Sequence, residues 1–359
     1  MAHQQGSSLI ATIGTAFTAF TYPQFAMRTP LSPASLLLRD PTLKAFENDL
    51  AHRLEQLKQS THDGSYLNLP WLRQALGATL DTNSAVEALF PDFELPYSER
   101  EDKWVDDYLD DSAKLLDVCN ALKAKISDMK HYQTQLQLAL HLVDARDNWG
   151  TRDAQCQRAR NALRDCLLAT KRRDEIQGQA KLDSCNSTLR RMADNKLAAP
   201  TLKSKLFISA IYGAKVNTIF TCGLLAAALS VKPRRPLSSL HVHSHFLWFA
   251  SLITLQHRVK DEIHTGKASG STALLGELTC IDAIVRQFHA ILDEAVLSKM
   301  LPLSKEQADK LRQLAENLRR QSEELGKGLG LLEQQVNELF RMLVNNRVAL
   351  LDLISHCRC

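Results

Sequence analysis

The sequence predicts an all-α protein, an elongated multi-helix bundle with long, coiled-coil-like antiparallel helices. Three observations predict this class. Aromatic residues make up only 6% of the chain and glycines number only 14 in 359 residues, both low for a protein rich in β-sheet. Apolar residues recur three and four positions apart over much of the chain, which is the helical period. Two of these apolar seams are long and heptad-like, as in coiled coils.

The N-terminal residues differ in composition from the rest of the chain. Residues 1–39 contain no Asp or Glu, are rich in Ser, Thr and Ala, and have Arg28 and Arg39 as their strong bases. This composition fits a disordered tail, and an organelle transit peptide is the alternative. We therefore expect two parts: an N-terminal tail over residues 1–39 and a single helical-bundle domain over residues 40–359.

Two helices are predicted before residue 91. Apolar residues between Leu43 and Leu57 follow helical spacing. A second helix is expected from Leu69 or Pro70 to Phe90, because proline is favoured in the first turn of a helix. Prolines at positions 91 and 96 then indicate a short extended linker.

The longest regular pattern begins near Ser98, where Ser98 and Glu101 form a capping-box motif, and Gly150 marks its expected end. The seam of this predicted helix consists of Trp104, Tyr108, Ser112, Leu115, Cys119, Leu122, Ile126, Met129, Leu136, Leu140 and Val143. The opposite face carries charges that we expect to be solvated, namely Asp106, Asp110, Lys114, Asp117 and Lys123. The seam should be buried, against either another helix of this chain or another chain. We favour packing within the chain, because other amphipathic helices are available to cover it.

The middle of the chain contains its most apolar segment. Polar helices are expected over residues 152–170 and again up to Asp194, separated by a loop at 171–179. Residues 206–231 are strongly apolar, and residues 237–256 contain no Asp, Glu, Lys or Arg. A basic break at 232–236 separates the two segments. They are interpreted either as two buried core helices, which we favour, or as a helical hairpin in a membrane.

The C-terminal third is again predicted to be helical. One helix is expected over residues 274–300, and Ser304 with Gln307 offers a second capping box. The second seam consists of Leu311, Leu314, Leu318, Leu325, Leu329, Leu332, Val336, Leu339, Leu343 and Leu350. Its step of eleven residues from Leu318 to Leu329 is typical of a stutter. Glycines at positions 326, 328 and 330 lie at this step and should weaken or kink the helix.

The sequence offers no candidate catalytic, cofactor-binding or metal-ligating residue. The net charge of +4 is nearly balanced, which gives no reason to expect a nucleic acid partner. His241, His243 and His245 suggest a metal site, but no further ligand completes the set by spacing, so a polar turn is the preferred interpretation. Residues 266–271 resemble a phosphate loop without its GxxxxGK[ST] order and are interpreted as a helix break. The acids of residues 106–111 are interpreted as a mostly solvated helix face rather than as catalytic carboxylates.

Eight cysteines are scattered along the chain without a C-x-x-C pair, and most lie among apolar helix positions. We interpret them as reduced thiols in a reducing compartment. The terminal Cys357-Arg358-Cys359 allows a second hypothesis, double prenylation, with two unmodified thiols as the alternative.

Four segments resemble the plant BYPASS family. They are residues 94–96, residues 101–121 with Trp104-Val105-Asp106 and Lys114-Leu115-Leu116-Asp117, residues 137–141, and residues 210–216 leading to Gly223 and Ala226-Ala227-Ala228. A weaker similarity extends over about residues 40–350. The resemblance implies a plant protein without known enzymatic chemistry and without family catalytic residues to transfer. Family members are associated with normal root and shoot development, through restraint of a mobile root-derived signal, and related members are linked to the exocyst, a vesicle-tethering complex.

The leading hypothesis is therefore a non-enzymatic developmental regulator that acts through protein–protein contact, with exocyst components among the candidate partners. The alternative is a membrane-associated accessory of vesicle trafficking, in which residues 206–256 contact the membrane. An enzyme that makes the mobile signal is a third hypothesis, for which the sequence offers no cofactor motif. The expected location is intracellular, either cytoplasmic or membrane-associated, with a plastid suggested by the acid-free N-terminus. The oligomeric state is left open.

Overall fold

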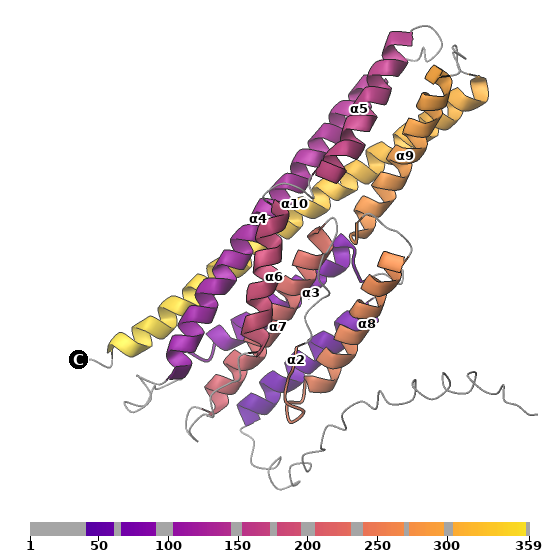
Figure 1. The fold of residues 1–359 in the computed structure, drawn as a ribbon. Helices are drawn as coiled ribbons and strands as arrows, with labels where there is room; N and C mark the ends of the chain where they lie inside the picture. The colour runs from indigo at the N-terminus through magenta and orange to yellow at the C-terminus, as the bar shows by residue number, and fades with distance from the viewer. Residues whose placement is uncertain are drawn as a thin grey trace, which may run out of the picture. The chain divides into compact units, whose positions relative to one another are not determined.

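The computed structural model describes residues 41–60, 66–90, 103–144, 153–172, 178–194, 205–230, 240–268, 273–297 and 304–356. All regular structure in these ranges is α-helical (Figure 1). The helices are α2 (Pro41–Gln59), α3 (Leu69–Glu87), α4 (Lys103–Asp144), α5 (Asp153–Arg172), α6 (Gly178–Asp194), α7 (Lys205–Leu229), α8 (Phe249–Ala268), α9 (Gly276–Leu297) and α10 (Lys305–His356). The predicted all-α bundle is confirmed.

The two longest helices, α4 and α10, lie at the centre of the helix packing. Helix α4 has 42 residues and α10 has 52, which corresponds to about 60 and 80 Å of helix. They run antiparallel, because Lys130 near the middle of α4 pairs with Glu333 while Leu109 near its start contacts Arg347 near the end of α10. Figure 1 shows the two helices side by side over most of their length.

The shorter helices complete two four-helix groups that share α4 and α10. In one group α5 and α9 pack against each other and against the long pair. In the other group α3 and α7 do the same, with α6 covering α4 and α7. Helix α2 packs on α3, α7 and α8 at the outside of the second group.

Both predicted seams lie in the core of this bundle. Every predicted seam residue of α10 is buried except Leu314, which is half-buried. The α4 seam is buried from Ser112 to Leu140, whereas Tyr108 is half-buried and the Val143 side chain lies outside the described residues. The expected helix ends at Ser98 and Gly150 also lie outside them. The seams pack against each other, so the intramolecular interpretation is confirmed.

The expected stutter in the α10 seam is wrong. The helix continues through Gly326, Gly328 and Gly330 as one element. The seam has no stutter, because Ser322 and Leu325 are fully buried and complete regular steps of four, three and four residues between Leu318 and Leu329. Gly326 and Gly328 allow close contact between helices: a Cβ at Gly326 would lie 3.0 Å from Nε2 of Gln133, and a Cβ at Gly328 would lie 2.7 Å from Cδ1 of Leu69.

Capping interactions explain several helix starts. Asn68 caps α3 by accepting a hydrogen bond from the backbone N–H of Trp71 (2.9 Å), with Pro70 in the first turn as expected. The predicted capping box at α10 is confirmed, since the Gln307 N–H donates to Ser304 Oγ and the Ser304 N–H donates to Gln307 Oε1, both at 3.2 Å.

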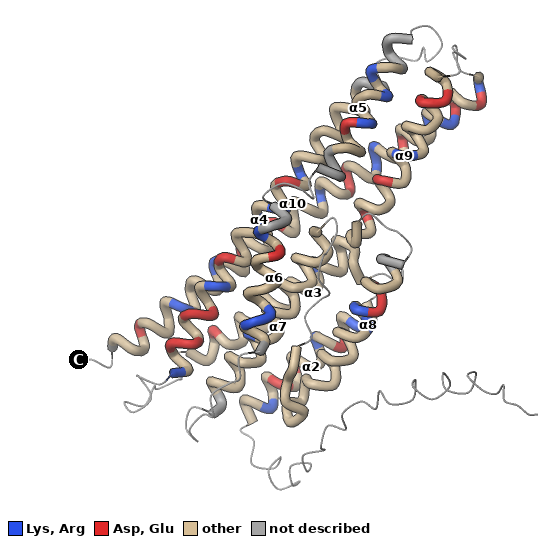
Figure 2. The backbone as a smooth tube through the Cα atoms, in the orientation of Figure 1, with Lys and Arg blue, Asp and Glu red and all other residues tan. Residues whose placement is uncertain are grey.

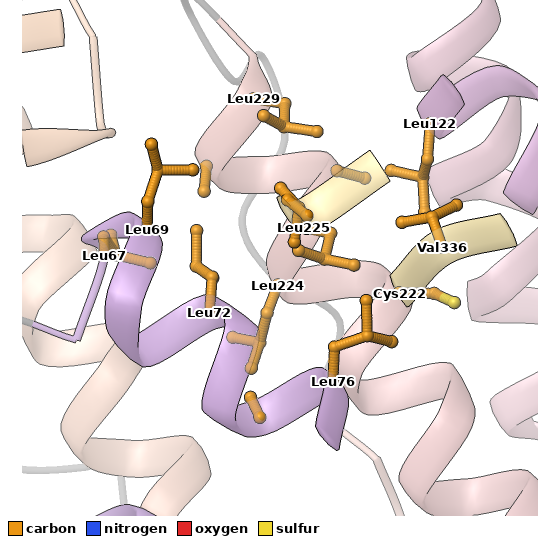
Figure 3. Close-up of a cluster of buried hydrophobic side chains, with 14 of the residues drawn as sticks. Leu67, Leu69, Leu72, Leu76, Leu122, Cys222, Leu224, Leu225, Leu229 and Val336 are labelled. Carbon is orange, nitrogen blue, oxygen red and sulfur yellow. The ribbon is translucent and has the colours of Figure 1, made fainter. Parts of the chain in front are cut away.

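Helix α7 is the central helix of the second group. Phe207–Leu229 is the only helix segment in the described ranges that is long and apolar enough to cross a membrane, and 94% of its most apolar window is buried by the surrounding helices. Figure 3 shows Cys222, Leu224, Leu225 and Leu229 of α7 facing Leu72 and Leu76 of α3, Leu122 of α4 and Val336 of α10.

The expectation of a second core helix over residues 237–256 is partly wrong. Residues 240–248 form an irregular turn, and α8 begins only at Phe249 and continues to Ala268. The polar-turn interpretation of the three histidines is confirmed. The ring of His245 lies 4.2 Å from that of Phe246, whose aromatic neighbours Tyr212 and Trp248 attach the turn to α7.

Charged residues of both signs are interspersed along α4, α5, α9 and α10 in Figure 2. Of the charges expected to be solvated on α4, Asp106, Asp110 and Asp117 are exposed and Lys114 and Lys123 are half-buried. Asp111 differs from the other acids of residues 106–111, which were expected to be mostly solvated, because its side chain is buried in the core.

Candidate functional site

An ion pair between Asp111 of α4 and Lys215 of α7 joins two of the segments that resemble the BYPASS family. The Lys215 Nζ contacts Asp111 Oδ2, and the two side chains are only 17% and 4% exposed. Lys114 lies one turn away with its Nζ 3.5 Å from the other carboxylate oxygen. Lys114 forms a closer pair with exposed Asp110 (2.5 Å), and this contact raises the pKa of the Lys114 ammonium. Asp111 is therefore the main counter-ion of Lys215.

This ion pair explains the charge at the apolar helix α7. Lys215 is followed by an uncharged stretch that extends to the end of the helix, so a bare ammonium at this depth would be strongly unfavourable. A buried pair contributes little net stability, but it penalises any arrangement that separates its two charges. The Asp111–Lys215 contact therefore defines one position of α7 along α4.

The C-terminal part of α10 contacts α4 beside this ion pair. Arg347 donates through Nη1 to the backbone carbonyl of Leu109 and to Ser112 Oγ, the latter at 2.9 Å. Ser112 also donates to the Leu109 carbonyl (2.9 Å), so hydroxyl and guanidinium share one acceptor. Burial raises the pKa of the neighbouring Tyr108 phenol well above its usual value, although Arg347 opposes the shift. Tyr108 therefore remains protonated at physiological pH.

These groups surround a small cavity of about 30 Å³. It is lined by Asn83 and Val86 of α3, Tyr108, Asp111, Ser112 and Leu115 of α4, Ile211, Ala214, Lys215 and Thr218 of α7, and Leu343 and Asn346 of α10. Asn346 is buried and its Oδ1 has no hydrogen-bond partner. The volume is enough for one water molecule with several polar partners, and too small for an organic substrate.

A hydroxyl and amide network continues from this cavity between α3 and α7. Asn83 Nδ2 donates to Thr218 Oγ1 (3.0 Å) and to the Thr79 carbonyl (2.9 Å). The hydroxyls of Thr79 and Thr221 are 2.7 Å apart, and Asn217 Nδ2 lies 3.3 Å from Thr79 Oγ1. Because these buried groups pair with one another, the network favours one register of α3 against α7.

Three cysteine thiols also meet in the core, which sequence reasoning missed. Cys119 of α4 and Cys222 of α7 are fully buried, and Cys185 of α6 lies beside them. A hydrogen bond to Cys119 and burial raise the pKa of Cys222, and burial raises that of Cys185 to about 11. The thiols of Cys185 and Cys222 are therefore protonated and poorly nucleophilic. The interpretation of the cysteines as reduced thiols agrees with the five described ones, none of which forms a disulfide bond.

The described residues contain no group of three or more His, Cys, Asp or Glu side chains placed to hold a metal ion. His243 and His245 stack with ring centroids 5.6 Å apart, with no acid or thiol completing a ligand set. The basic break at 232–236, the side chain of Cys156 and the Cys357-Arg358-Cys359 end lie outside the described residues.

Of the family-like segments, the structure brings together residues from 101–121 and from 210–216 at the cavity. Residues 137–141 lie near the other end of α4, with Leu140 buried and Leu138 60% exposed. Sequence reasoning identified both segments but not their contact, because helical periodicity gives the buried face of a helix and not the helix that covers it. Asp111 was missed as a core residue, since its position among other acids resembles a solvated face.

Comparisons with known proteins identify the family of this chain. The family model described as Protein ROH1-like matches residues 34–199 and 180–354. The chain is 33% identical over 262 residues to UPF0496 protein 4 of Oryza sativa subsp. japonica, covering 72% of this chain and 55% of that protein. It is 28% identical over 316 residues to Protein BPS1, chloroplastic, of Arabidopsis thaliana, covering 87% and 83%. Protein ROH1D of Arabidopsis thaliana is 22% identical over 91% of both chains.

The chain thus spans about half the length of its rice relative and most of the length of the two Arabidopsis relatives. No solved structure matches the chain. The family model covers well over half of the sequence, including both segments that meet at the Asp111–Lys215 pair. The chain therefore belongs to the BYPASS/ROH1-like family of plant proteins.

Proposed function

We propose that this chain is a non-enzymatic developmental regulator of plants that acts through protein–protein contact and restrains a mobile, root-derived growth signal. The observation that carries the proposal is the relationship to BPS1, which extends over 87% of this chain and 83% of that protein. More than four fifths of each chain is matched, so the relationship extends well beyond a single motif.

The packing of the long helices supports a contact role on the outside of the bundle. The apolar seams of α4 and α10 are buried against each other and against neighbouring helices. A protein partner would therefore bind outward-facing side chains without unfolding the bundle. The cavity at the Asp111–Lys215 pair supports a scaffolding role for that cluster, because 30 Å³ leaves no room for a substrate there.

Reciprocal grafting tests the proposal in a plant that lacks the protein. A wild-type shoot on a mutant root should stop growing early, and a mutant shoot on a wild-type root should grow normally, because the signal moves from root to shoot. A grafted wild-type shoot that grows normally on mutant roots would exclude restraint of a mobile signal. Protein-contact action is tested in the same plants by affinity purification, and recovery of no specific protein would contradict it.

The second candidate function is a membrane-associated accessory of vesicle trafficking, with exocyst components as partners. The observation that favours it is the length and apolar character of α7, together with the similarity to ROH1D. It predicts that exocyst subunits co-purify with the chain and that defects stay within the cells lacking the protein. Carbonate extraction tests membrane insertion through residues 206–256, since an inserted hairpin stays in the pellet and a buried α7 does not.

The location is part of the proposal. The name of the BPS1 relative carries the word chloroplastic, and residues 1–39 of this chain contain no acid. A plastid location is therefore a direct alternative to a cytoplasmic or membrane-associated one. A fluorescent protein fused to the C-terminus, with and without residues 1–39, separates them: only a targeting segment would change the compartment when it is removed.

A further inference from the structure

A second and larger cavity lies between α2 and α3, where α10 closes one side. Its volume is about 440 Å³, within the range of small-molecule sites. Its lining includes polar side chains from three helices, namely Arg53 of α2, Arg73 and Asp81 of α3, and Gln335 of α10. Figure 1 shows α2 and α3 as neighbouring helices in the second group. The cavity is separate from the Asp111–Lys215 cluster, with which it shares no lining residue.

Two arginines from opposite helices line this cavity, and each has one enclosed nitrogen without a hydrogen-bond partner among the described residues. Arg53 Nη1 and Arg73 Nε are enclosed and donate no hydrogen bond to any described group. Neither arginine forms an ion pair with Asp81, the one acid in the lining, or with another described carboxylate. Buried polar groups are normally hydrogen-bonded, so two enclosed arginine N–H groups without acceptors beside one cavity point to a ligand that supplies the acceptors.

The position of the arginines is fixed by the helices that carry them. Gln335 Nε2 donates to the backbone carbonyl of Arg73 (3.3 Å), while Gln335 Oε1 is buried and unpaired. Arg73, Gly77 and Asp81 follow each other at intervals of four residues and so lie on one face of α3. A Cβ at Gly77 would come within 3.7 Å of Gln335 Nε2, so glycine leaves this side of the cavity open.

The chemistry of the lining defines the ligand class. A phosphate monoester carries a charge of about −1.5 to −2 at pH 7 and matches two fixed positive charges. Guanidinium groups recognise phosphate oxygens through paired N–H donors. The cavity is much larger than a phosphate, and Asp81 with Gln56 and Gln74 offers acceptors and amides for hydroxyl groups. We propose that the α2–α3 cavity binds a phosphorylated polyol through Arg53 and Arg73.

This proposal goes beyond the proposed function and does not depend on it. The ligand has two sources, a soluble sugar or inositol phosphate and the headgroup of a phosphoinositide in a membrane. Both present the same phosphate and hydroxyl groups to the cavity. The experiment therefore needs a soluble arm and a vesicle arm.

Calorimetry on the full chain tests the soluble arm with glycerol 3-phosphate and inositol 1,4,5-trisphosphate. Sedimentation with phosphatidylcholine vesicles, with and without phosphatidylinositol 4-phosphate, tests the membrane arm. Arg53→Gln and Arg73→Gln should each weaken binding by about tenfold to a hundredfold, the range expected for loss of one charge-assisted contact. Arg73→Lys should also weaken binding, because lysine keeps the charge but loses the paired donors.

Arg341→Gln is the matched control. Arg341 is exposed on the outer face of α10 and does not line the cavity, so the variant removes the same charge elsewhere. Its affinity should remain within about twofold of the wild type, since long-range charge effects are screened by salt. Circular dichroism of each variant checks that the bundle is intact.

Binding in the soluble arm supports a soluble phosphorylated polyol, and binding in the vesicle arm alone supports a lipid headgroup. Absence of binding in both arms at millimolar concentrations overturns the proposal. It is equally overturned by binding that Arg53→Gln and Arg73→Gln leave unchanged, or by binding that Arg341→Gln weakens to the same extent. If one glutamine variant fails to fold, Arg73→Lys and the other single variant provide the same comparison.

Discussion

The Asp111–Lys215 pair offers a sharp test of how the family-like segments are held together. In Asp111→Asn the Lys215 ammonium loses its counter-ion while its side chain stays only 17% exposed. Breaking a buried pair on one side costs about 3–5 kcal/mol. The partial exposure of Lys215 reduces this, so we expect a loss of about 2–3 kcal/mol in the free energy of unfolding. Lys114 contributes little to the loss, because it keeps its 2.5 Å contact with Asp110.

The assay is urea unfolding of four proteins: the wild type, Asp111→Asn, Lys215→Met and the double variant. The double variant should be less destabilised than the sum of the single variants by at least about 1 kcal/mol, because it leaves no charge unpaired. Asp110→Asn is the control: its side chain is 67% exposed, so its cost should stay below about 1 kcal/mol. Additive single effects, or equal costs for Asp111→Asn and Asp110→Asn, would refute the inferred buried pair.

Four further predictions concern the packing of the bundle. Leu122→Ala should lower the free energy of unfolding by about 3 kcal/mol in urea titration, because Leu122 is fully buried in the α4 seam. Gly328→Ala should destabilise by about 1–2 kcal/mol, since the new Cβ would overlap Leu69. Gly330→Ala should instead stabilise α10 by up to about 1 kcal/mol, because its Cβ would meet no atom within 4 Å. Iodoacetamide at pH 8 should label exposed Cys280 in the native protein but spare Cys185, whose thiol pKa is raised to about 11 by burial.

Each of these predictions has an internal comparison. Leu138 on α4 is 60% exposed, so Leu138→Ala should change stability far less than Leu122→Ala; equal effects would show that the buried face of α4 is misassigned. Equal stability of the two α10 glycine variants would remove the argument for close packing at Gly328. Peptide mapping by mass spectrometry locates the alkylated thiols, and labelling of Cys185 in the native state as fast as in urea would contradict its burial.

Local periodicity was sufficient to predict most helices and their buried faces. The second helix, the α10 capping box and the two seams follow from residue spacing and from side chains that act on their own backbone. Such signals are contained within a few turns of helix, so they can be read without knowing the fold. The family was also recognisable, because its motifs lie on α4 and α7 as continuous segments.

Where prediction failed, a distant residue decided the outcome. The glycines of α10 were expected to weaken or kink the helix, and their role in packing was missed, because the close approach of Leu69 to Gly328 comes from α3. The apolar composition of residues 240–248 suggested a helix. Instead these residues form a turn, which is stabilised by stacking of Phe246 with Tyr212 and Trp248. In both cases the competing interaction comes from another part of the chain.

By itself the sequence determined the fold class, which face of each long helix is buried and which is exposed to solvent, and the family. These follow because the hydrophobic effect acts on each side chain largely independently of which partner covers it. Only the tertiary structure decided that Asp111 is buried, that Lys215 and Arg347 reach the start of α4, and that Arg53 and Arg73 meet around one cavity. Charge pairing and cavities depend on distances between groups far apart in the chain, and a distance of this kind exists only once the helices are packed.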